Sequence, residues 1–274
     1  MYPPKKILFP IDFSQRSAAI APIVANFARQ FHAAPTLLHV LPEEAIDEQR
    51  IEAQEDLSVF ADSHFSGISV CRTLLQGDAG KEIIEFAHEH KIDLIMMPTH
   101  GYGPFRRLLL GSVALKVLRD AWCPVWTDAH TEVPLSHQNA KFRNILCAVD
   151  LSKRSHPALH WAKQFAADTQ ARLTIVHATP LAVAAGVGAP IPDWRPEIED
   201  AAREEIARLQ HSEGTHAGVT IVAGEVAHAV RAAAEEAEAD LLVIGRGAEN
   251  GHLGRLRNHA YPIIRHSPCP VVSV

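Results

Sequence analysis

The chain is poor in cysteine, and the cysteines that it has are scattered. Its 274 residues include only Cys71, Cys123, Cys147 and Cys269, and no two of them lie close together in the sequence. This spacing argues against a disulfide framework and against a zinc site built on cysteine pairs. Cys123 and Cys269 both stand in a Cys-Pro pair near the end of an apolar segment, which predicts buried, unreactive thiols.

The chain also lacks a long apolar run and an excess of basic charge. No segment approaches the roughly 20 apolar residues of a membrane-spanning helix, and the initial MYPPKKILFP has no signal-peptide core. The formal net charge is -6, opposite in sign to surfaces that bind nucleic acid or anionic lipid. We therefore expect a cytoplasmic protein that binds neither nucleic acid nor membranes.

What the chain does contain is one layout that occurs twice. KKILFPIDFSQRS at residues 5–17 matches FRNILCAVDLSKRS at residues 142–155, and DLIMMP at 93–98 matches DLLVIG at 240–245. A repeat that spans nearly the whole chain predicts two similar domains, each of ordinary domain size.

The ends of the two copies place the domain boundaries. AWCPVW at 121–126 matches SPCPVV at 267–272, and a polar stretch follows the first of these segments. We expect one domain at residues 1–128, a linker at 129–143 and a second domain at 144–274.

Short apolar runs alternate with helical patterns in each half. Strands of the first half are predicted at 7–12, 36–41, 68–75, 93–97 and 124–127. Ser14 and Asp78 are the expected caps of the helices that follow them, and a further helix begins at Ser112. Short apolar strands separated by helices indicate an α/β fold, with a parallel sheet covered on both faces.

A glycine-bearing loop follows the fourth predicted strand of the first half. The segment PTHGYGPFRRLLLGS at 98–112 ends where an amphipathic helix begins. Free amides at a helix amino terminus attract anions, and glycine lets a ligand approach the backbone closely. This arrangement predicts a phosphate site, although a plain α/β connection would have the same pattern.

These segments resemble the universal stress protein family, and the chain as a whole resembles its tandem members. The family's domains are five-stranded, doubly wound parallel sheets with the strand order 3-2-1-4-5, Rossmann-like and related to the adenine nucleotide alpha-hydrolases. Its nucleotide-binding members carry G-x2-G-x9-G-[S/T] after the fourth strand. This chain has Pro98, Gly101 and Gly111-Ser112 at that spacing, so the first glycine is replaced.

The resemblance implies roles for residues of the first half. It assigns adenine and ribose contacts to Asp12 and Val40, with Pro10 lining the pocket. It assigns phosphate contacts to Gly101, Gly111, Ser112 and Val113, whereas Pro98 lacks the N–H that glycine would supply. Asp12 could instead cap the helix that follows it.

The second half departs further from the family pattern. Asp150, Gly245 and Gly247 are retained, but Arg257 and Asn258 stand where the first half has Gly111 and Ser112. Arg257 would fill the phosphate subsite, and Asn258 could simply cap the last helix. We expect a weakened or altered site in this half.

Several features leave alternatives open. Arg106, Arg107, Arg246, Arg255 and Arg257 fall in the two glycine loops and could steer anions or serve as solubilising surface charge. The segment at 179–194, which has no counterpart in the first half, could cover the sheet or act as a lid or partner surface.

The histidines show no zinc-site spacing. His39 and His177 occupy matching places in the two halves, which suggests a shared structural role. A metal, Mg or Mn, is expected only as the companion of nucleotide phosphates.

Three functions are compatible with this sequence. The first is a stress-response regulatory protein that binds ATP or a related adenine nucleotide and is read by unidentified protein partners. The others are a slow ATPase or phosphotransferase, for which no catalytic base is evident, and a nucleotide-independent scaffold or apolar-ligand binder. Family resemblance further implies that the two domains pair through their last strands, with a homodimer as a possible larger assembly.

Overall fold

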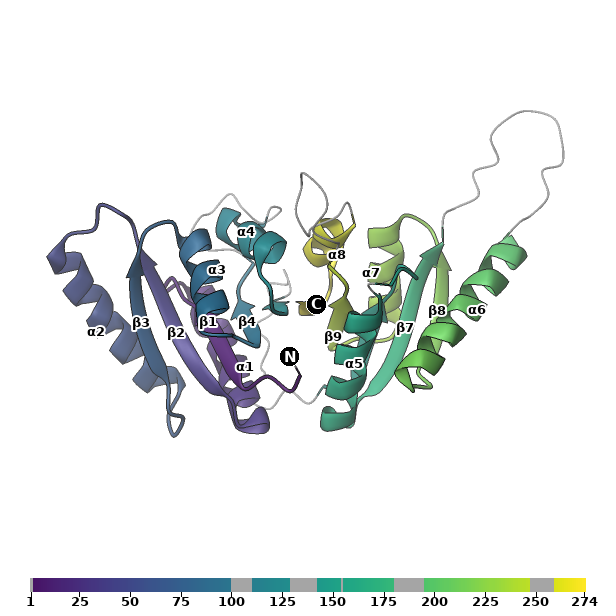
Figure 1. Ribbon diagram of the computed structural model, residues 1–274, viewed down its shortest axis with the longest axis horizontal. Coiled ribbons are helices and arrows are strands. Elements are labelled where there is room, and N and C mark those ends of the chain that lie inside the picture. The colour runs from purple at the N-terminus through teal and green to yellow at the C-terminus, as the bar shows by residue number, and fades with distance from the viewer. Residues whose placement is uncertain (1, 100–109, 129–141, 154, 180–194, 247–258) are drawn as a thin grey trace, which may run out of the picture.

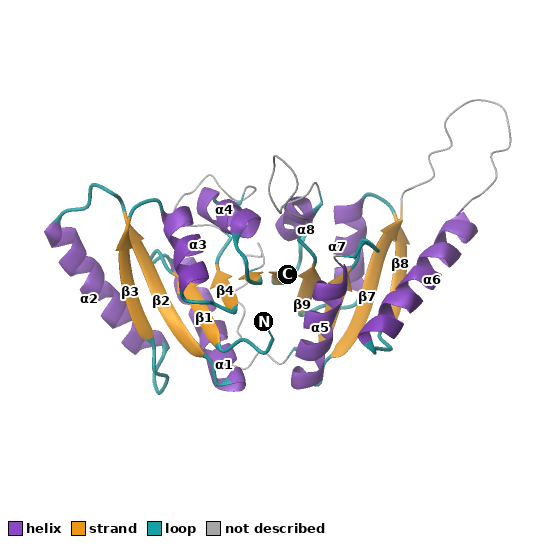
Figure 2. Ribbon diagram, viewed as in Figure 1, coloured by secondary structure: helices purple, strands orange, loops and turns teal. Residues whose placement is uncertain are grey.

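The computed structural model describes residues 2–99, 110–128, 142–153, 155–179, 195–246 and 259–274. Strands and helices alternate along each half of the chain (Figures 1 and 2). The elements of the first half are β1 (Lys6–Pro10), α1 (Gln15–Phe31), β2 (Ala34–Leu41), α2 (Asp47–His64), β3 (Cys71–Gln76), α3 (Ala79–Glu89), β4 (Leu94–Met97), α4 (Ser112–Asp120) and β5 (Val125–Thr127).

The second half repeats this order. Its elements are β6 (Asn144–Ala148), α5 (Ser155–Thr169), β7 (Arg172–Thr179), α6 (Arg195–Glu213), β8 (Gly218–Ala223), α7 (Val226–Glu236), β9 (Leu241–Ile244), α8 (Ala260–His266) and β10 (Val271–Ser273). Within the described residues, no helix combines the length and apolar character needed to cross a membrane.

The two halves form one ten-stranded sheet. Its order is β3-β2-β1-β4-β5-β10-β9-β6-β7-β8, so each half has the expected order 3-2-1-4-5. The strands are parallel within each half, and the halves join where β5 and β10 pair antiparallel, with Trp126 opposite Val272. The expected pairing of the two domains through their last strands is therefore confirmed.

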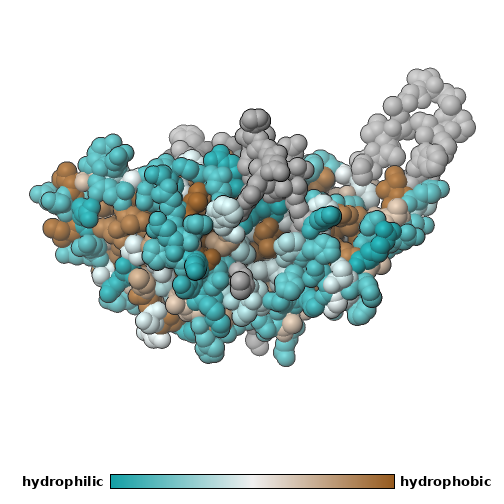
Figure 3. Space-filling view, viewed as in Figure 1, coloured by the Kyte–Doolittle hydropathy of each residue, from teal (hydrophilic) through white to brown (hydrophobic). Residues whose placement is uncertain are grey.

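Helices cover both faces of this sheet. Residues of α1, α2, α5 and α6 share one buried apolar cluster, whereas residues of α3, α4, α7 and α8 share the other. The central strands, such as β1 and β4, are apolar along most of their length because both faces are covered. The face of the molecule seen in Figure 3 is largely polar, and apolar side chains lie scattered over it, as is normal for a folded domain.

Aromatic side chains join the two domains on the face of the sheet that α1 and α5 cover. The ring of Phe27 in α1 stacks on that of Phe165 in α5 with centroids 5.6 Å apart, and Phe142 contacts both rings. Tyr2 packs edge-on against Trp161. Each such ring pair contributes roughly 0.5–1.5 kcal/mol beyond its buried area, so the joint between the domains does not depend on the β5–β10 ladder alone.

The helix starts agree with the sequence, whereas one strand does not. Ser14 and Asp78 cap α1 and α3 by accepting from the amides of Ser17 and Lys81, and α4 begins at Ser112 as expected. The third strand was predicted at 68–75 but begins at Cys71. A turn in which the Ile68 N–H donates to the Phe65 carbonyl delays it.

Candidate functional site

A cavity of about 230 Å³ opens at the carboxyl ends of β1, β2 and β4, beside the first turn of α4. This is where ligands bind in doubly wound sheets, because the winding direction reverses between β1 and β4. The residues that the family resemblance assigned to binding converge there, and those that line the cavity are Pro10, Asp12, Val40, Pro98, Gly111, Ser112 and Val113. Gly101 lies outside the described residues, and all these binding roles stay predictions.

Asp12 organises the turn between β1 and α1. Its Oδ1 accepts from the Ser14 N–H at 3.0 Å and from the Ser17 hydroxyl at 2.7 Å, while Phe13 adopts a left-handed φ of 60°. Its Oδ2 has no hydrogen-bond partner within the part of the chain that the structure describes. Asp12 is therefore not the cap of α1, because Ser14 holds that position. It orders the turn before the helix, and within the described residues it keeps one acceptor oxygen without a partner.

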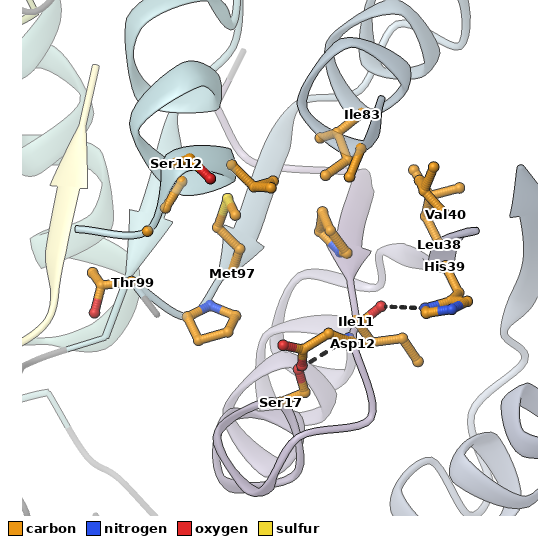
Figure 4. A pocket seen from close by; sticks show the side chains of 16 residues that line it. Ile11, Asp12, Ser17, Leu38, His39, Val40, Ile83, Met97, Thr99 and Ser112 are labelled. Atoms are coloured by element: carbon orange, nitrogen blue, oxygen red, sulfur yellow. Dashed lines mark hydrogen bonds between the residues drawn. The ribbon is translucent and has the colours of Figure 1, made fainter. Parts of the chain in front are cut away.

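His39 holds β2 against the end of β1. Its Nδ1 lies 2.8 Å from the Ile11 carbonyl (Figure 4), and its ring packs on Phe13 with centroids 4.5 Å apart. His177 repeats the contact in the second half, with Nδ1 2.8 Å from the Val149 carbonyl. The predicted shared structural role of these histidines is confirmed.

The first turn of α4 presents bare amides to the cavity. Gly111 occupies the N-cap position and has no side chain to cap the helix, and the first turn carries no acidic residue. Among the described residues, no acceptor pairs with the N–H groups of Ser112, Val113 or Ala114. Three amides and the positive end of a helix dipole therefore face the same corner of the cavity.

Gly111 does not need its glycine for backbone freedom. Its φ of −61° and ψ of 148° are open to any residue. The position lines the cavity and has no side chain. The Gly111 N–H also donates to the Thr99 carbonyl at 2.9 Å, which ties the end of the loop to β4.

Asp128 bonds to Thr99, which lines the cavity, and the sequence did not single Asp128 out. Its Oδ1 accepts from the Thr99 N–H at 2.8 Å and from the Thr99 hydroxyl at 3.0 Å. Burial raises the pKa of this carboxyl group above its ordinary value, although the bonds from Thr99 and the nearby Arg16 oppose the rise. The available signal was an aspartate directly after the fifth strand, where the second half has Val274.

The second half has a larger cavity at the equivalent place. Its volume is about 320 Å³, and Asp150, Gly245 and Arg246 line it. Asp150 copies Asp12, because its Oδ1 accepts from the hydroxyls of Ser152 and Ser155. Of the other second-site candidates, Gly247 and Arg257 lie outside the described residues.

The helix beside this second cavity begins later than α4 does. With His259 at its N-cap position, α8 starts at Ala260 and has seven residues, against nine in α4. Asn258, which the sequence allowed as the cap of this helix, lies outside the described residues. Pro262, which has no N–H, falls in the first turn, so α8 offers fewer free amides than α4.

Arg246 corrects an expectation. The sequence allowed it to be a surface charge or an anion-steering residue, and an exposure of only 8% rules out the surface charge. The anion-steering role stays a prediction. Its guanidinium donates to the carbonyls of Ala121 and Cys123 in the first domain. The side chain is therefore committed to the protein interior. Arg106, Arg107 and Arg255 lie outside the described residues, as does most of the 179–194 segment.

The cysteines are free, Cys123 and Cys269 are buried as predicted, and Cys147 is buried as well. Burial raises the pKa of the Cys123 thiol to about 11 and that of Cys269 to about 12. Such thiols are poor nucleophiles at neutral pH. In the described ranges, no group of three histidine, cysteine or acidic side chains is placed to hold a metal ion.

Comparisons with known proteins agree with this architecture. Universal stress protein MJ0531 of Methanocaldococcus jannaschii is 34% identical over 137 residues, which cover 44% of this chain and 79% of that protein. Universal stress protein A homolog 1 of Coxiella burnetii is 32% identical over 142 residues, covering 48% of this chain and 96% of the homolog.

A solved structure matches both halves together. The crystal structure of a universal stress protein from Archaeoglobus fulgidus DSM 4304 aligns with 99% of this chain and 98% of its own, with a TM-score of 0.76 at 24% identity, and so shows the same fold. The family model described as the Universal stress protein family matches residues 3–127 and again residues 141–274. The chain thus belongs to the universal stress protein family and carries the family's domain twice.

Proposed function

We propose that the first domain binds ATP or a related adenine nucleotide, and that the protein serves as a stress-response regulator. The observation that carries this proposal is the cavity itself, which brings a free carboxylate oxygen and three bare helix amides to one place. A nucleotide has a sugar with hydroxyl donors and an anionic tail, and these two parts match the two ends of the cavity.

Val40 would contact the edge of the base. The Leu38 carbonyl accepts from the Ile11 N–H on the β1 side of β2. Alternate residues of a strand direct their backbone groups to the same side, so those of Val40 point to that side beyond the end of β1. Within the described residues neither group has a hydrogen-bond partner on that side, so both would be left for a ligand, and the Val40 side chain need only be apolar.

The other end of the cavity would take the phosphates. Its volume is below the roughly 300–1,000 Å³ of a typical drug-sized site, so it suits the base and sugar and leaves the phosphates at the mouth. There the amides of Ser112, Val113 and Ala114 and the Ser112 hydroxyl would meet them, with Mg or Mn as companion. Pro98 adds no donor.

The second domain would bind the same ligand weakly or prefer another one. Asp150 keeps the sugar end, but the shorter α8 and Pro262 remove donors from the phosphate end. The larger cavity of this domain is compatible with an altered ligand.

Binding is favoured over hydrolysis. Asp12 is the sole carboxylate among the described residues that line the first cavity, and its Oδ1 is committed to the β1–α1 turn. A phosphoryl transfer site needs a group that positions the attacking nucleophile, and one partly committed carboxylate at the sugar end does not supply it.

Isothermal titration calorimetry with ATP and GTP, together with thermal unfolding, tests the proposal. We expect saturable ATP binding and weaker GTP binding. At a ligand concentration of 100 times Kd, stabilisation should be roughly 2.7 kcal/mol. Absence of both heat and stabilisation would refute nucleotide binding and favour the scaffold alternative.

A further inference from the structure

Arg246 connects the second domain to the end of α4, the helix whose first turn lines the first cavity. It lies two residues after the end of β9, lines the second cavity and is buried. Its Nη1 donates to the Ala121 carbonyl at 2.9 Å, and its Nη2 donates to the Cys123 carbonyl at 2.5 Å. Its own N–H donates to the Val274 carbonyl at 2.7 Å. Both its main chain and its side chain are therefore fixed.

The chemistry of this contact is specific to arginine. Burying a guanidinium is costly unless its donors are paired. Here two donors meet the carbonyl of Cys123, between α4 and β5, and that of Ala121, at the carboxyl end of α4. That end of a helix carries partial negative charge, which favours a cation. The forked guanidinium reaches both carbonyls at once, whereas a lysine ammonium is a single point of charge.

Arg246 contacts the segment at residues 121–123, which connects α4 to β5. Both of these elements lead to residues of the first cavity. Backward along the chain the segment continues into α4, whose first turn carries the bare amides of Ser112 and Val113. A nine-residue helix is about 14 Å long and behaves as a short rod, so fixing its last turn helps to fix its first.

Forward along the chain, the segment enters β5, which ends beside Asp128. The carboxylate of Asp128 holds both the N–H and the hydroxyl of Thr99, and Thr99 lines the cavity. Arg246 is therefore connected to two parts of the phosphate end. One is the first turn of α4, and the other is Thr99, which Asp128 holds in place.

The two copies differ at this position. DLIMMPT in the first half aligns with DLLVIGR in the second, so Thr99 and Arg246 are equivalent residues. Thr99 bonds to Asp128 of its own domain, whereas Arg246 reaches across to the other domain.

We propose that Arg246 of the second domain is a positioning residue for the nucleotide site of the first domain. This inference rests on the proposed function. It means that the second domain supports the first site even where its own cavity binds no nucleotide.

The test compares three variants of the full chain. Arg246→Met keeps an apolar stem and removes the guanidinium, Arg246→Lys keeps the charge, and Arg231→Met is the matched control. Arg231 lies on α7 of the same domain, half-exposed, and bonds only locally to Glu235 among the described residues. ATP affinity is measured by calorimetry, and amide hydrogen exchange is measured without nucleotide.

We expect Arg246→Met to weaken ATP binding about tenfold, since small displacements of positioned groups have large effects. Arg246→Lys should lose less, and Arg231→Met should match the wild type. Exchange should accelerate at the bonded amides of Gly111 and Leu115 but not at Ile11, whose amide bonds to Leu38 on the other side of the cavity.

Unchanged ATP affinity together with unchanged exchange at Gly111 and Leu115 would overturn the inference. So would a uniform acceleration that includes Ile11, because it would show only a loss of stability. If the wild type binds no ATP, the proposed function fails, and the exchange pattern still decides whether Arg246 positions α4. If Arg246→Met does not fold, Arg246→Lys provides the same comparison.

Discussion

The two cavities share one end and differ at the other. At the shared end, Asp12 and Asp150 each accept from a serine in the following helix, and the residue after each aspartate, Phe13 or Leu151, has a left-handed φ near 60°. At the other end, α4 begins at Ser112 with bare amides, whereas α8 begins at Ala260 and soon meets Pro262.

This comparison separates what the fold requires from what a ligand requires. The aspartate turn and the histidine contact recur in both halves because each connects a strand to its neighbours. The start of the helix after the fourth strand is not needed for the fold, so it can vary between the copies. A difference confined to that corner is therefore the best indicator of a difference in ligand binding.

The largest effect is expected from making the first cavity resemble the second. Gly111→Arg places at the N-cap of α4 the residue type that the sequence alignment puts there in the second half. The side chain would fill the mouth of the cavity, and ATP affinity should fall more than a hundredfold. Leu115→Arg adds the same charge on the exposed face of the same helix and should leave affinity nearly unchanged. Equal affinities of these two variants, measured by calorimetry, would place the phosphates elsewhere.

A proline substitution isolates one amide. Ser112→Pro removes the first N–H of α4 at a position where proline suits a helix, and the extended ψ of 148° at Gly111 tolerates a following proline. Loss of one hydrogen bond to a charged group is worth about 1.5–3 kcal/mol, so ATP affinity should fall at least tenfold. Ser112→Ala keeps the amide and should lose less. Similar losses in both variants would mean that the hydroxyl, not the amide, makes the contact.

A matched pair of substitutions tests the shared end. Asp12→Asn keeps an oxygen that can accept from Ser14 and Ser17 but replaces the free oxygen with an amide group. We expect roughly tenfold weaker ATP binding, with little change in melting temperature. Asp150→Asn makes the same change in the second domain and should not alter the high-affinity site. If Asp150→Asn weakened ATP binding and Asp12→Asn did not, the high-affinity site would lie in the second domain instead of the first.

The smallest effect is expected from a change at Asp128, which bonds to Thr99 beside the first cavity. Burial raises the pKa of Asp128, so the charged carboxylate lowers the stability of the folded protein. This loss of stability is absent below the ordinary pKa and grows as the pH rises through the raised pKa. Asp128→Asn keeps an acceptor for Thr99 without the charge. Relative to the wild type, this variant should therefore become more stable, with a larger free energy of unfolding, as the pH rises from about 3 to 7. Urea unfolding across that range measures the difference, and a constant difference would contradict this account.

Local features of both halves were predictable from the sequence. Ser14, Asp78 and Ser112 mark helix starts because capping depends on residues only a few positions apart. The strand order followed from the family resemblance rather than from periodicity, since periodicity does not say which strands are neighbours.

The contacts that the sequence did not predict join residues that are far apart in the chain. Asp128 bonds to Thr99 across 29 positions, and Arg246 reaches Ala121 across 125. Neither contact leaves a periodic pattern, and both arise only when the sheet brings the ends of distant strands together. Ser17 was also overlooked as a partner of Asp12, although its repetition at Ser155 was visible in the sequence.

The most direct test of the central claim is the number of nucleotides bound per chain. Native mass spectrometry of the purified protein at an ATP concentration well above the calorimetric Kd should show one nucleotide per chain, and none at the same concentration for Gly111→Arg. Two nucleotides per chain with equal affinity, or one that Gly111→Arg retains, would contradict the account.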